Sequence, residues 1–268
     1  MFLQFLIVLE GAMKKHPSTS NLILRPKQAK ALESVYCGKD VFINFRTGYG
    51  KSVVFILARD IVGLVRGISN PICLIVSPLN SLISDQANKL KNEGFNVGVM
   101  TVKKLEEPIG MPAAIGSESE ESDDVGRTDL DDTMTIRNGK PVDPRLQVDN
   151  WSMIETGQVD YLFAHPEAIT SRHLGRKLLD KDVYKKKVAV LAIDEAHCIV
   201  TWGPAFRKDY SNLSVLNAFI PNVLKIVATA TAPKSYCQDI IKSLEMDGAT
   251  DIFITNPDGE HQVCGSVS

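Results

Sequence analysis

The stretch from residue 40 to residue 66 reads DVFINFRTGYGKSVVFILARDIVGLVR. Its first six residues, DVFINF, are mainly β-branched and aromatic, which is typical of a buried strand. A glycine-containing turn follows, and after it the apolar residues recur at helical spacing. A strand, a glycine-rich turn and a helix in this order form the setting in which a backbone binds phosphate groups. The stretch therefore predicts an α/β fold with a phosphate site after one of its strands.

The turn itself carries the residue types that polyphosphate binding requires. Gly48 and Gly50 allow the backbone to curl so that its N–H groups point at the ligand, and the following helix adds its positive dipole end. Lys51 should reach the β and γ phosphates, and the hydroxyl of Ser52 should bind Mg²⁺. The full phosphate-loop pattern places Gly at position 45, where this chain has Phe45. The predicted phosphate-binding residues are Thr47, Gly48, Tyr49, Gly50, Lys51 and Ser52.

Strand and helix patterns alternate along the rest of the chain. Strands are predicted at 40–45, 71–77, 96–101, 160–164, 188–193, 224–229 and 251–255. Helices are predicted over 52–66, 80–93 and 234–246. Several strands are apolar without alternation, as expected when both faces are buried. The pattern predicts a mostly parallel sheet with helices on both faces and a ligand crevice at the carboxyl ends of the strands.

Residues 103–149 break this alternation. They are rich in Gly, Pro, Ser and Asp, so we expect a disordered acidic insertion. Segment 117–132 holds eight acids and one Arg, whereas the whole chain of 268 residues has a net charge of −2. The remainder is therefore mildly basic, which fits a polyanionic partner but is also ordinary for a protein that has none.

The N-terminal segment, residues 1–19, begins with nine residues that are apolar apart from Gln4, and this stretch ends at Glu10. A packing helix, an error of gene prediction and a weak signal sequence remain open readings. No run of apolar residues is long enough to span a membrane. The five cysteines lack metal-ligand spacing, so we expect reduced thiols in an intracellular protein and no zinc site.

A second candidate site follows the apolar strand at 188–193, where the sequence reads LAIDEAH. Asp194 can hold Mg²⁺ through water, and Glu195 can orient or deprotonate an attacking water. The alternative is structural, with Asp194 capping a helix and Glu195 favouring its dipole. The phosphate loop elsewhere in the chain favours the catalytic interpretation of Lys51, Asp194 and Glu195.

Three segments in order, TGYGKS (47–52), IDEAH (193–197) and VATATAP (227–233), resemble motifs I, II and III of superfamily 2 helicases. Three others resemble the RecQ-like group, namely LRPKQAKAL (24–32), SPLNSLISDQ (77–86) and AHCIVTWGPAFRKDY (196–210). The resemblance covers residues 20–256 apart from the insertion. It implies a RecA-like, DEAH-type ATP-binding domain, the first of the two motor domains of such helicases.

This resemblance implies roles for further residues. Gln28 would read the adenine edge of ATP, with Arg25 close by. His197, Trp202, Phe206 and Arg207 would contact single-stranded or forked DNA and couple that contact to hydrolysis. Without the resemblance, the aromatic spacing would fit a packing stripe. A basic run at 171–187 fits a phosphate-tracking face or a solvated helix equally well.

The sequence also departs from the family. Pro204 stands where the family has the His that couples DNA contact to ATP hydrolysis. The chain reaches Ser268 soon after motif III, so we expect the tail 257–268 and no second RecA-like domain with its arginine finger. We therefore expect slow hydrolysis and no unwinding by this chain alone.

The resemblance implies an ATP- and Mg²⁺-dependent 3′–5′ DNA helicase, with a nuclear role in DNA repair and recombination. The alternative is a non-catalytic module that binds ATP and DNA, or a truncated helicase copy.

Overall fold

A computed structural model describes residues 2–102, 136–137, 140–141, 146–171, 174–201, 212–230, 232–246, 250–254 and 263–264. The main strands are β1 (Val41–Asn44), β2 (Ile72–Val76), β3 (Val97–Val102), β6 (Leu146–Asp149), β7 (Tyr161–Ala164), β8 (Val188–Ile193), β9 (Leu224–Thr229), β10 (Asp251–Ile254) and β11 (Val263–Cys264). A separate pair consists of β4 (Ile136–Arg137) and β5 (Lys140–Pro141).

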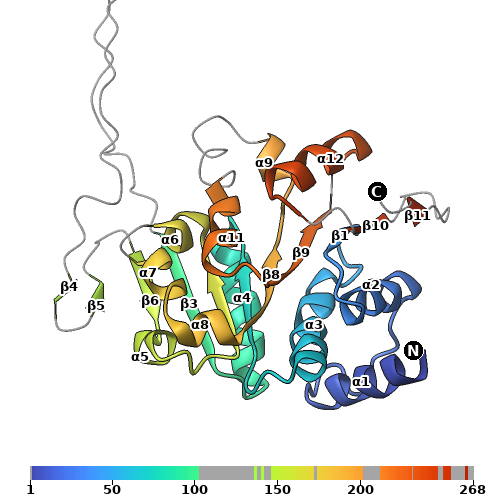
Figure 1. Cartoon of the computed structure of the whole chain (residues 1–268), viewed down its shortest axis with the longest axis horizontal. Coiled ribbons are helices and arrows are strands. Elements are labelled where there is room, and N and C mark those ends of the chain that lie inside the picture. Colours follow the sequence, from blue (N-terminus) through green and yellow to red (C-terminus); the bar gives the residue numbers. More distant parts are fainter. Residues whose placement is uncertain are drawn as a thin grey trace, which may run out of the picture.

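The main strands form one sheet in the order β11-β10-β1-β9-β8-β2-β7-β3-β6. All neighbours are parallel except the two edge strands, β11 and β6, which are antiparallel to β10 and β3. All seven predicted strands are present, and the prediction of a mostly parallel sheet is confirmed. The order places β9 between β1 and β8 (Figure 1).

The helices are α1 (Phe2–Lys14), α2 (Pro26–Tyr36), α3 (Lys51–Arg66), α4 (Asn80–Asn92), α5 (Trp151–Glu155), α6 (Pro166–Thr170), α7 (Gly175–Leu179), α8 (Asp182–Lys187), α9 (Cys198–Thr201), α11 (Leu216–Phe219) and α12 (Lys234–Ser243), with a 3-10 turn η1 (Asn212–Val215). The three predicted helices correspond to α3, α4 and α12. In α4 the buried stripe is Ile83, Ala87 and Leu90, so Leu82 and Gln86 lie at its margin.

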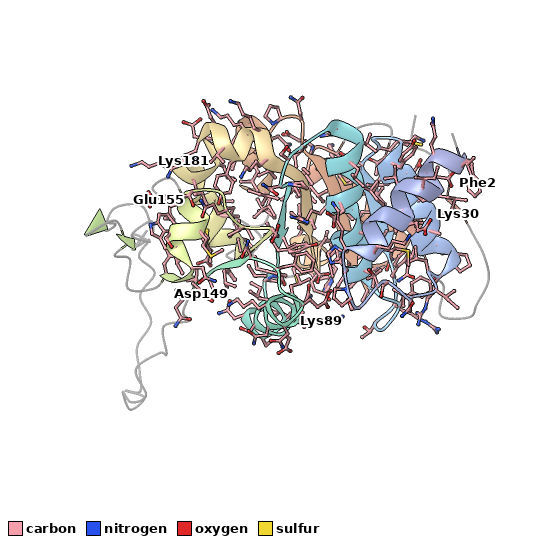
Figure 2. The ribbon with its side chains drawn as sticks, turned by 90° about the horizontal axis from the view of Figure 1, so that it is seen from below. Phe2, Lys30, Lys89, Asp149, Glu155 and Lys181 are labelled. Atoms are coloured by element: carbon pink, nitrogen blue, oxygen red, sulfur yellow. The ribbon has the colours of Figure 1, made fainter. Side chains whose placement is uncertain are left out.

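Two hydrophobic cores lie on the two faces of the sheet. Alternation along β1 separates them, because Val41 and Ile43 contribute to one core and Phe42 to the other. The first core contains residues of α1 to α4, and the second contains residues of α5 to α12. Figure 2 shows α4, which carries Lys89, and the segment with Lys181 on opposite sides of the molecule. Helices therefore cover both faces, as predicted.

The N-terminal segment packs against the domain. Phe5, Leu9 and Ala12 of α1 are buried in the core that α3 shares. Beyond α1, the buried ring of His16 places Nε2 2.7 Å from Oδ2 of Asp60 on α3, and stacks on Phe95. Of the readings that the sequence left open, the packing helix is the one that the structure contains.

The predicted insertion, residues 103–149, falls mostly outside the described residues. Within it, 136–137 and 140–141 form the pair β4 and β5. The prediction of disorder is wrong for its last four residues, since 146–149 form β6 along β3. Their alternating exposure fits an edge strand with one face on the core. Within the described part of the chain, no helix is both long and apolar enough to cross a bilayer.

Candidate functional site

Four segments singled out in the sequence follow four adjacent strands. Residues 46–52 follow β1, 229–231 end β9, 194–197 follow β8 and 77–80 follow β2. Because these strands are parallel, their carboxyl ends lie along the same edge of the sheet. The topology thus assembles, from distant parts of the chain, the single edge that the sequence predicted.

The phosphate loop is shaped by two left-handed glycines. Gly48 has a φ of 77° and Gly50, the residue before α3, has a φ of 90°. A Cβ on Gly48 would meet no atom within 4 Å, whereas a Cβ on Gly50 would lie 2.5 Å from Nε2 of Gln28. Gly50 is therefore required both by its backbone angle and by the close approach of α2.

Gln28 joins α2 to this loop. Its Nε2 donates to the carbonyl oxygens of Tyr49, at 2.9 Å, and Gly50, at 3.1 Å, and its Oε1 accepts from the backbone N–H of Arg25 at 2.8 Å. The guanidinium of Arg25 lies 4.6 Å from the centre of the Tyr49 ring. Both N–H groups of the buried Gln28 amide are thus used within the protein, and the second lone pair of Oε1 remains for a further donor.

Lys51 lies between the two carboxylates. Its Nζ donates to Oε1 of Glu195 over 2.9 Å and lies 3.6 Å from Oδ1 of Asp194. Lys51 opens α3 after β1, whereas the two acids follow β8, two positions away in the sheet. The fold therefore brings the three predicted catalytic residues into direct contact.

The backbone at Glu195 explains how two adjacent acids face one lysine. The N–H of Asp194 donates to Val76 of β2, whereas the N–H of Ala196 donates to Ala228 of β9. In a regular strand, groups two residues apart point the same way. The chain rotates at Glu195, whose φ of 50° is unusual for a residue other than glycine.

The two carboxyl groups have opposite pKa shifts. A hydrogen bond from His197, together with Lys51, lowers the pKa of Glu195 to about 2, so it is ionised at neutral pH. Burial raises the pKa of Asp194, and the nearby Lys51 only partly opposes this effect. The charged form of Asp194 is therefore electrostatically unfavourable, and a cation beside the carboxylate would stabilise it.

His197 connects the acidic pair to β9. Its Nδ1 lies 3.3 Å from Oε2 of Glu195 and 3.1 Å from Oγ1 of the buried Thr229. The carbonyl oxygen of Thr229 in turn accepts from the N–H of Phe45, just before the phosphate loop. A continuous chain of polar contacts therefore runs from Lys51 through Glu195 and His197 to Thr229, across the ends of β1, β8 and β9.

Comparison with known proteins assigns this arrangement to a family. The DEAD/DEAH box helicase family model matches residues 25–121 and 134–240, more than half of the chain. The chain belongs to the DEAD/DEAH box helicase family. Within this helicase domain, the matched residues include the phosphate loop, Asp194, Glu195 and Thr229.

Curated relatives confirm the RecQ-like resemblance. The ATP-dependent DNA helicase hus2/rqh1 of Schizosaccharomyces pombe is 31% identical over 85% of this chain and 14% of that protein. The ATP-dependent DNA helicase RecQ of Haemophilus influenzae is 27% identical over 83% of this chain and 28% of that protein. This helicase domain thus spans a minor part of each relative's length.

A solved structure shows the same fold. The DEAD-box helicase Mss116 bound to ssRNA and UDP-BeF aligns with a TM-score of 0.59, at 15% identity, over 94% of this chain and 44% of that chain. At this identity the similarity supports the RecA-like fold of the helicase domain alone.

Three residues that the sequence reasoning did not select also contribute to the site. Thr229 contacts His197, Nε2 of Gln86 on α4 lies 3.5 Å from Oδ2 of Asp194, and Nδ2 of Asn44 donates to the carbonyl oxygen of Ala232 over 2.5 Å. A sequence signal existed for Gln86, a polar residue between Leu82 and Leu90 at helical spacing. Asn44 offered a weaker signal, as an amide at the end of an apolar strand.

The predicted DNA-contact residues are only partly described. His197 lies in the site, whereas Trp202, Phe206 and Arg207 fall outside the described residues, as does Pro204. In the basic run, Lys181 and Lys185 pair with Glu155 and Asp180. Lys187 and Arg176 donate to backbone carbonyl oxygens. These contacts favour a solvated, internally bonded face over a phosphate-tracking one.

The donor set fits Mg²⁺. Asp194 offers carboxylate oxygens, and Ser52, half-buried in the first turn of α3, offers a hydroxyl. Hard oxygen ligands are those that Mg²⁺ prefers. The raised pKa of Asp194 shows that its charge is not fully compensated by Lys51, so a second cation would be favourable there.

Proposed function

We propose that this chain is the first motor domain of a RecQ-type, ATP-dependent 3′–5′ DNA helicase. The observation that carries the proposal is the position of Lys51, whose Nζ contacts both Asp194 and Glu195 at the carboxyl ends of β1 and β8. A phosphate-loop lysine beside a magnesium-type aspartate and a water-orienting glutamate is the arrangement required for hydrolysis of a nucleoside triphosphate.

In this mechanism Glu195 and the phosphates of ATP compete for the ammonium group of Lys51. Its ammonium group bonds Glu195, and we propose that the β and γ phosphates of ATP attract it away. Glu195 would then lose one of the contacts that lower its pKa and become a better acceptor for a proton from the attacking water. Binding of ATP would thereby activate the base.

Mg²⁺ would be held by Asp194 and Ser52, and when bound it would neutralise charge on the phosphates. Asp194 is held in place by the N–H of Glu195, which donates to its Oδ1 over 2.9 Å. This hydrogen bond would therefore hold the proposed metal ligand, Asp194, and the proposed base, Glu195, in a fixed position relative to each other.

Gln28 and Arg25 are proposed to bind the adenine end. Since both N–H groups of Gln28 bond the phosphate loop, the free lone pair of Oε1 is the group available to accept from the adenine amino group. Arg25, stacked on Tyr49, would border the same space. Gln28 would thus link adenine recognition to the conformation of the phosphate loop.

DNA contact is proposed for Trp202, Phe206 and Arg207, with His197 passing the signal to Glu195. Aromatic side chains stack on the bases of single strands, at about 1–3 kcal/mol per base. The contact of His197 with both Glu195 and Thr229 supports its part in this proposal. Single-stranded or forked DNA, a nuclear location and a role in repair and recombination rest on the RecQ-like relatives. Unwinding would require a second motor domain.

A second candidate function is a non-catalytic module that binds ATP and DNA. One observation favours it: Pro204 offers no side-chain donor at the position of the family's coupling His. The two functions differ in turnover, because a module would bind ATP without hydrolysing it.

The test is ATP hydrolysis with and without single-stranded DNA, together with binding of a fluorescent ATP analogue. Wild type should turn over ATP, whereas Lys51→Ala should lose both binding and turnover. Lys89→Ala, an exposed position on α4, serves as the control. Binding without turnover in the wild type would support the module, and binding unaffected by Lys51→Ala would refute both proposals.

A further inference from the structure

A cavity of about 500 Å³ lies at the amino ends of the strands, whereas the proposed ATP site lies at their carboxyl ends. Val188, the first residue of β8, and Val223, which precedes β9, both line it. These are the amino ends of strands whose carboxyl ends carry Asp194 and Thr229. The cavity is therefore separated from the proposed nucleotide site by the full length of the strands, and it has the size of a typical ligand site, about 300–1,000 Å³.

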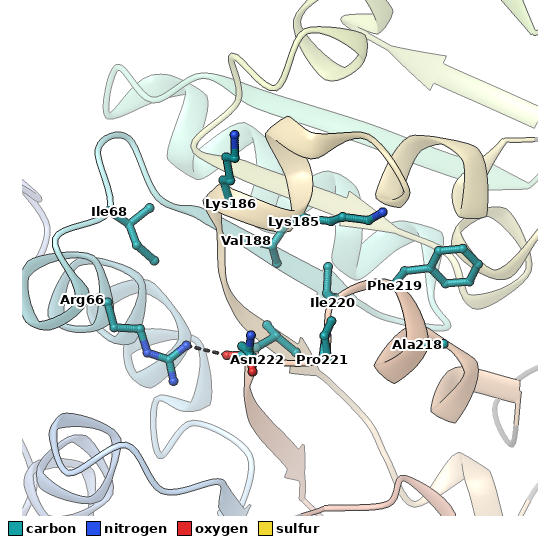
Figure 3. A pocket seen from close by; sticks show the side chains of 11 residues that line it. Arg66, Ile68, Lys185, Lys186, Val188, Ala218, Phe219, Ile220, Pro221 and Asn222 are labelled. Atoms are coloured by element: carbon teal, nitrogen blue, oxygen red, sulfur yellow. Dashed lines mark hydrogen bonds between the residues drawn. The ribbon is translucent and has the colours of Figure 1, made fainter.

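The cavity combines an apolar lining with cations. Ile68, Val188, Phe219 and Ile220 are among the apolar residues that line it. Arg66, Lys185 and Lys186 are the charged ones, and no acidic side chain of the described residues contributes (Figure 3). A ligand that fills this cavity must offer apolar surface and negative charge together.

Two of the three cations lack an acidic partner within the described part of the chain. Arg66, at the end of α3, donates through Nη1 to the carbonyl oxygen of Asn222 over 2.5 Å, which leaves its charge unpaired (Figure 3). Lys186 is exposed. Lys185 bonds Asp180 over 2.7 Å, but both side chains are largely exposed, so that pair is weak. The cavity therefore has a net positive rim.

We propose that this cavity docks an acidic peptide segment of a partner protein, with one large hydrophobic side chain of the segment inserted among the apolar residues. Charge complementarity favours such a segment, because carboxylates on either side of the inserted side chain would meet Arg66 and Lys186. A nucleic-acid strand fits less well, since phosphates cannot fill the apolar part and, among the described residues that line the cavity, only Phe219 offers an aromatic ring for stacking. This site is independent of the proposed ATPase activity.

The test is fluorescence anisotropy with a labelled twelve-residue probe of Asp and Glu with one central Phe. A second peptide replaces the Phe with Ser, a third replaces the acids with Lys, and a labelled oligothymidine provides the nucleic-acid arm. The acidic Phe peptide should bind in low salt and weaken as salt is raised. The other two peptides should bind at least about tenfold more weakly.

Variants locate the binding. Lys186→Glu and Ala218→Glu both add an acid at exposed lining positions, and each should weaken binding by at least about tenfold. Lys177→Glu makes the same charge change as Lys186→Glu, but on the exposed side of α7 and outside the cavity, and should change affinity less than twofold, or about 0.4 kcal/mol.

Equal loss in all three variants would show a diffuse charge effect and overturn the proposal. Tighter binding of the oligothymidine than of the peptide, with the same loss in Lys186→Glu, would instead assign the cavity rim to nucleic acid. Absence of peptide binding to the wild type would also end the proposal.

Discussion

The ammonium group of Lys51 donates to Oε1 of Glu195 over 2.9 Å, so the lysine of the phosphate loop and the proposed catalytic base are directly bonded. Each stabilises the charge of the other, and a phosphate that takes Lys51 changes the environment of Glu195. In the proposed mechanism, this contact links nucleotide binding to water activation.

Glu195→Gln should separate binding from hydrolysis. The amide keeps the shape of the side chain but cannot accept a proton, and general-base catalysis contributes about 10²- to 10⁴-fold in rate. We expect DNA-stimulated turnover to decrease by a factor of about 10² to 10⁴, while the fluorescent ATP analogue still binds. Glu155→Gln, on α5, is the matched control and should have wild-type turnover. Undiminished turnover in Glu195→Gln would assign the base to another residue.

Asp194→Asn should stabilise the fold while abolishing Mg²⁺-dependent hydrolysis. Burial raises the pKa of Asp194, so its charged form lowers stability above that pKa, and the cost disappears as pH falls through it. A neutral isostere removes this cost at pH 7. We therefore expect a higher Tm for Asp194→Asn than for wild type at pH 7, measured by thermal unfolding. Each gain of about 1 kcal/mol in unfolding free energy would raise the Tm of a domain of this size by roughly 2–4 °C.

The pH dependence provides the control for Asp194→Asn. The Tm difference between variant and wild type should shrink as the pH is lowered from 7 towards the raised pKa. A variant that is less stable than wild type at pH 7 would show that the contact with Lys51 outweighs desolvation.

Gly50→Ala and Gly48→Ala should differ in severity. Both impose the cost of a left-handed alanine, about 1–2 kcal/mol, because both glycines have positive φ. Only at Gly50 does the new Cβ also collide with Gln28. We expect a larger loss of unfolding free energy and of ATP affinity for Gly50→Ala, measured by urea titration and analogue binding.

A double variant identifies the cause of this difference. Gln28→Ala removes the colliding amide, so Gly50→Ala should cost less in a Gln28→Ala background than in the wild type. Additive effects would mean that the collision is relieved in some other way.

Asp60→Asn should loosen the N-terminal helix. Asp60 is fully buried and contacts His16, Lys15 and Arg59, and the loss of one partner from a buried ionic cluster costs about 3–5 kcal/mol. Urea unfolding should report this loss, and limited proteolysis should cut between α1 and α2 more rapidly. Glu10→Gln disrupts an exposed pair with Lys14 and should leave the unfolding midpoint nearly unchanged.

Pro204→His should raise the stimulation of ATP hydrolysis by single-stranded DNA. The change restores a side-chain donor and acceptor where the RecQ-like pattern has its coupling His. The measurement is the ratio of turnover with and without DNA, in this chain and in a protein that includes a second motor domain. Gly203→Ala, a neighbouring change that adds no polar group, is the control. An equal stimulation ratio in wild type, Pro204→His and Gly203→Ala would contradict the coupling role.

Local pattern was enough to predict most of the strands of this domain, together with helices α3, α4 and α12. The seven predicted strands are runs of apolar, β-branched residues, and burial on both faces makes such runs recognisable without knowledge of their neighbours. The phosphate loop and the acidic pair were also evident, because Gly48, Gly50, Lys51, Asp194 and Glu195 have requirements of residue type that short segments express.

The order of the strands and the contacts across them depended on the tertiary structure. Nothing local to β1 or β8 specifies that β9 lies between them, so the contact of His197 with Thr229 could not be derived from either segment. Residues 146–149 form a strand only because β3 offers an edge for pairing. The buried bond between His16 and Asp60 joins positions 44 residues apart.

Gln28 shows the division between sequence and structure most clearly. From the sequence, only the resemblance of segment 24–32 to a RecQ-like motif implied that Gln28 belongs to the nucleotide site. Its two bonds to the phosphate loop, and hence the reason that Gly50 must be glycine, exist only because α2 packs against α3. Sequence determines which chemical groups are available, and long-range packing decides which of them meet, because hydrogen bonds and ion pairs act over a few ångströms in space regardless of separation along the chain.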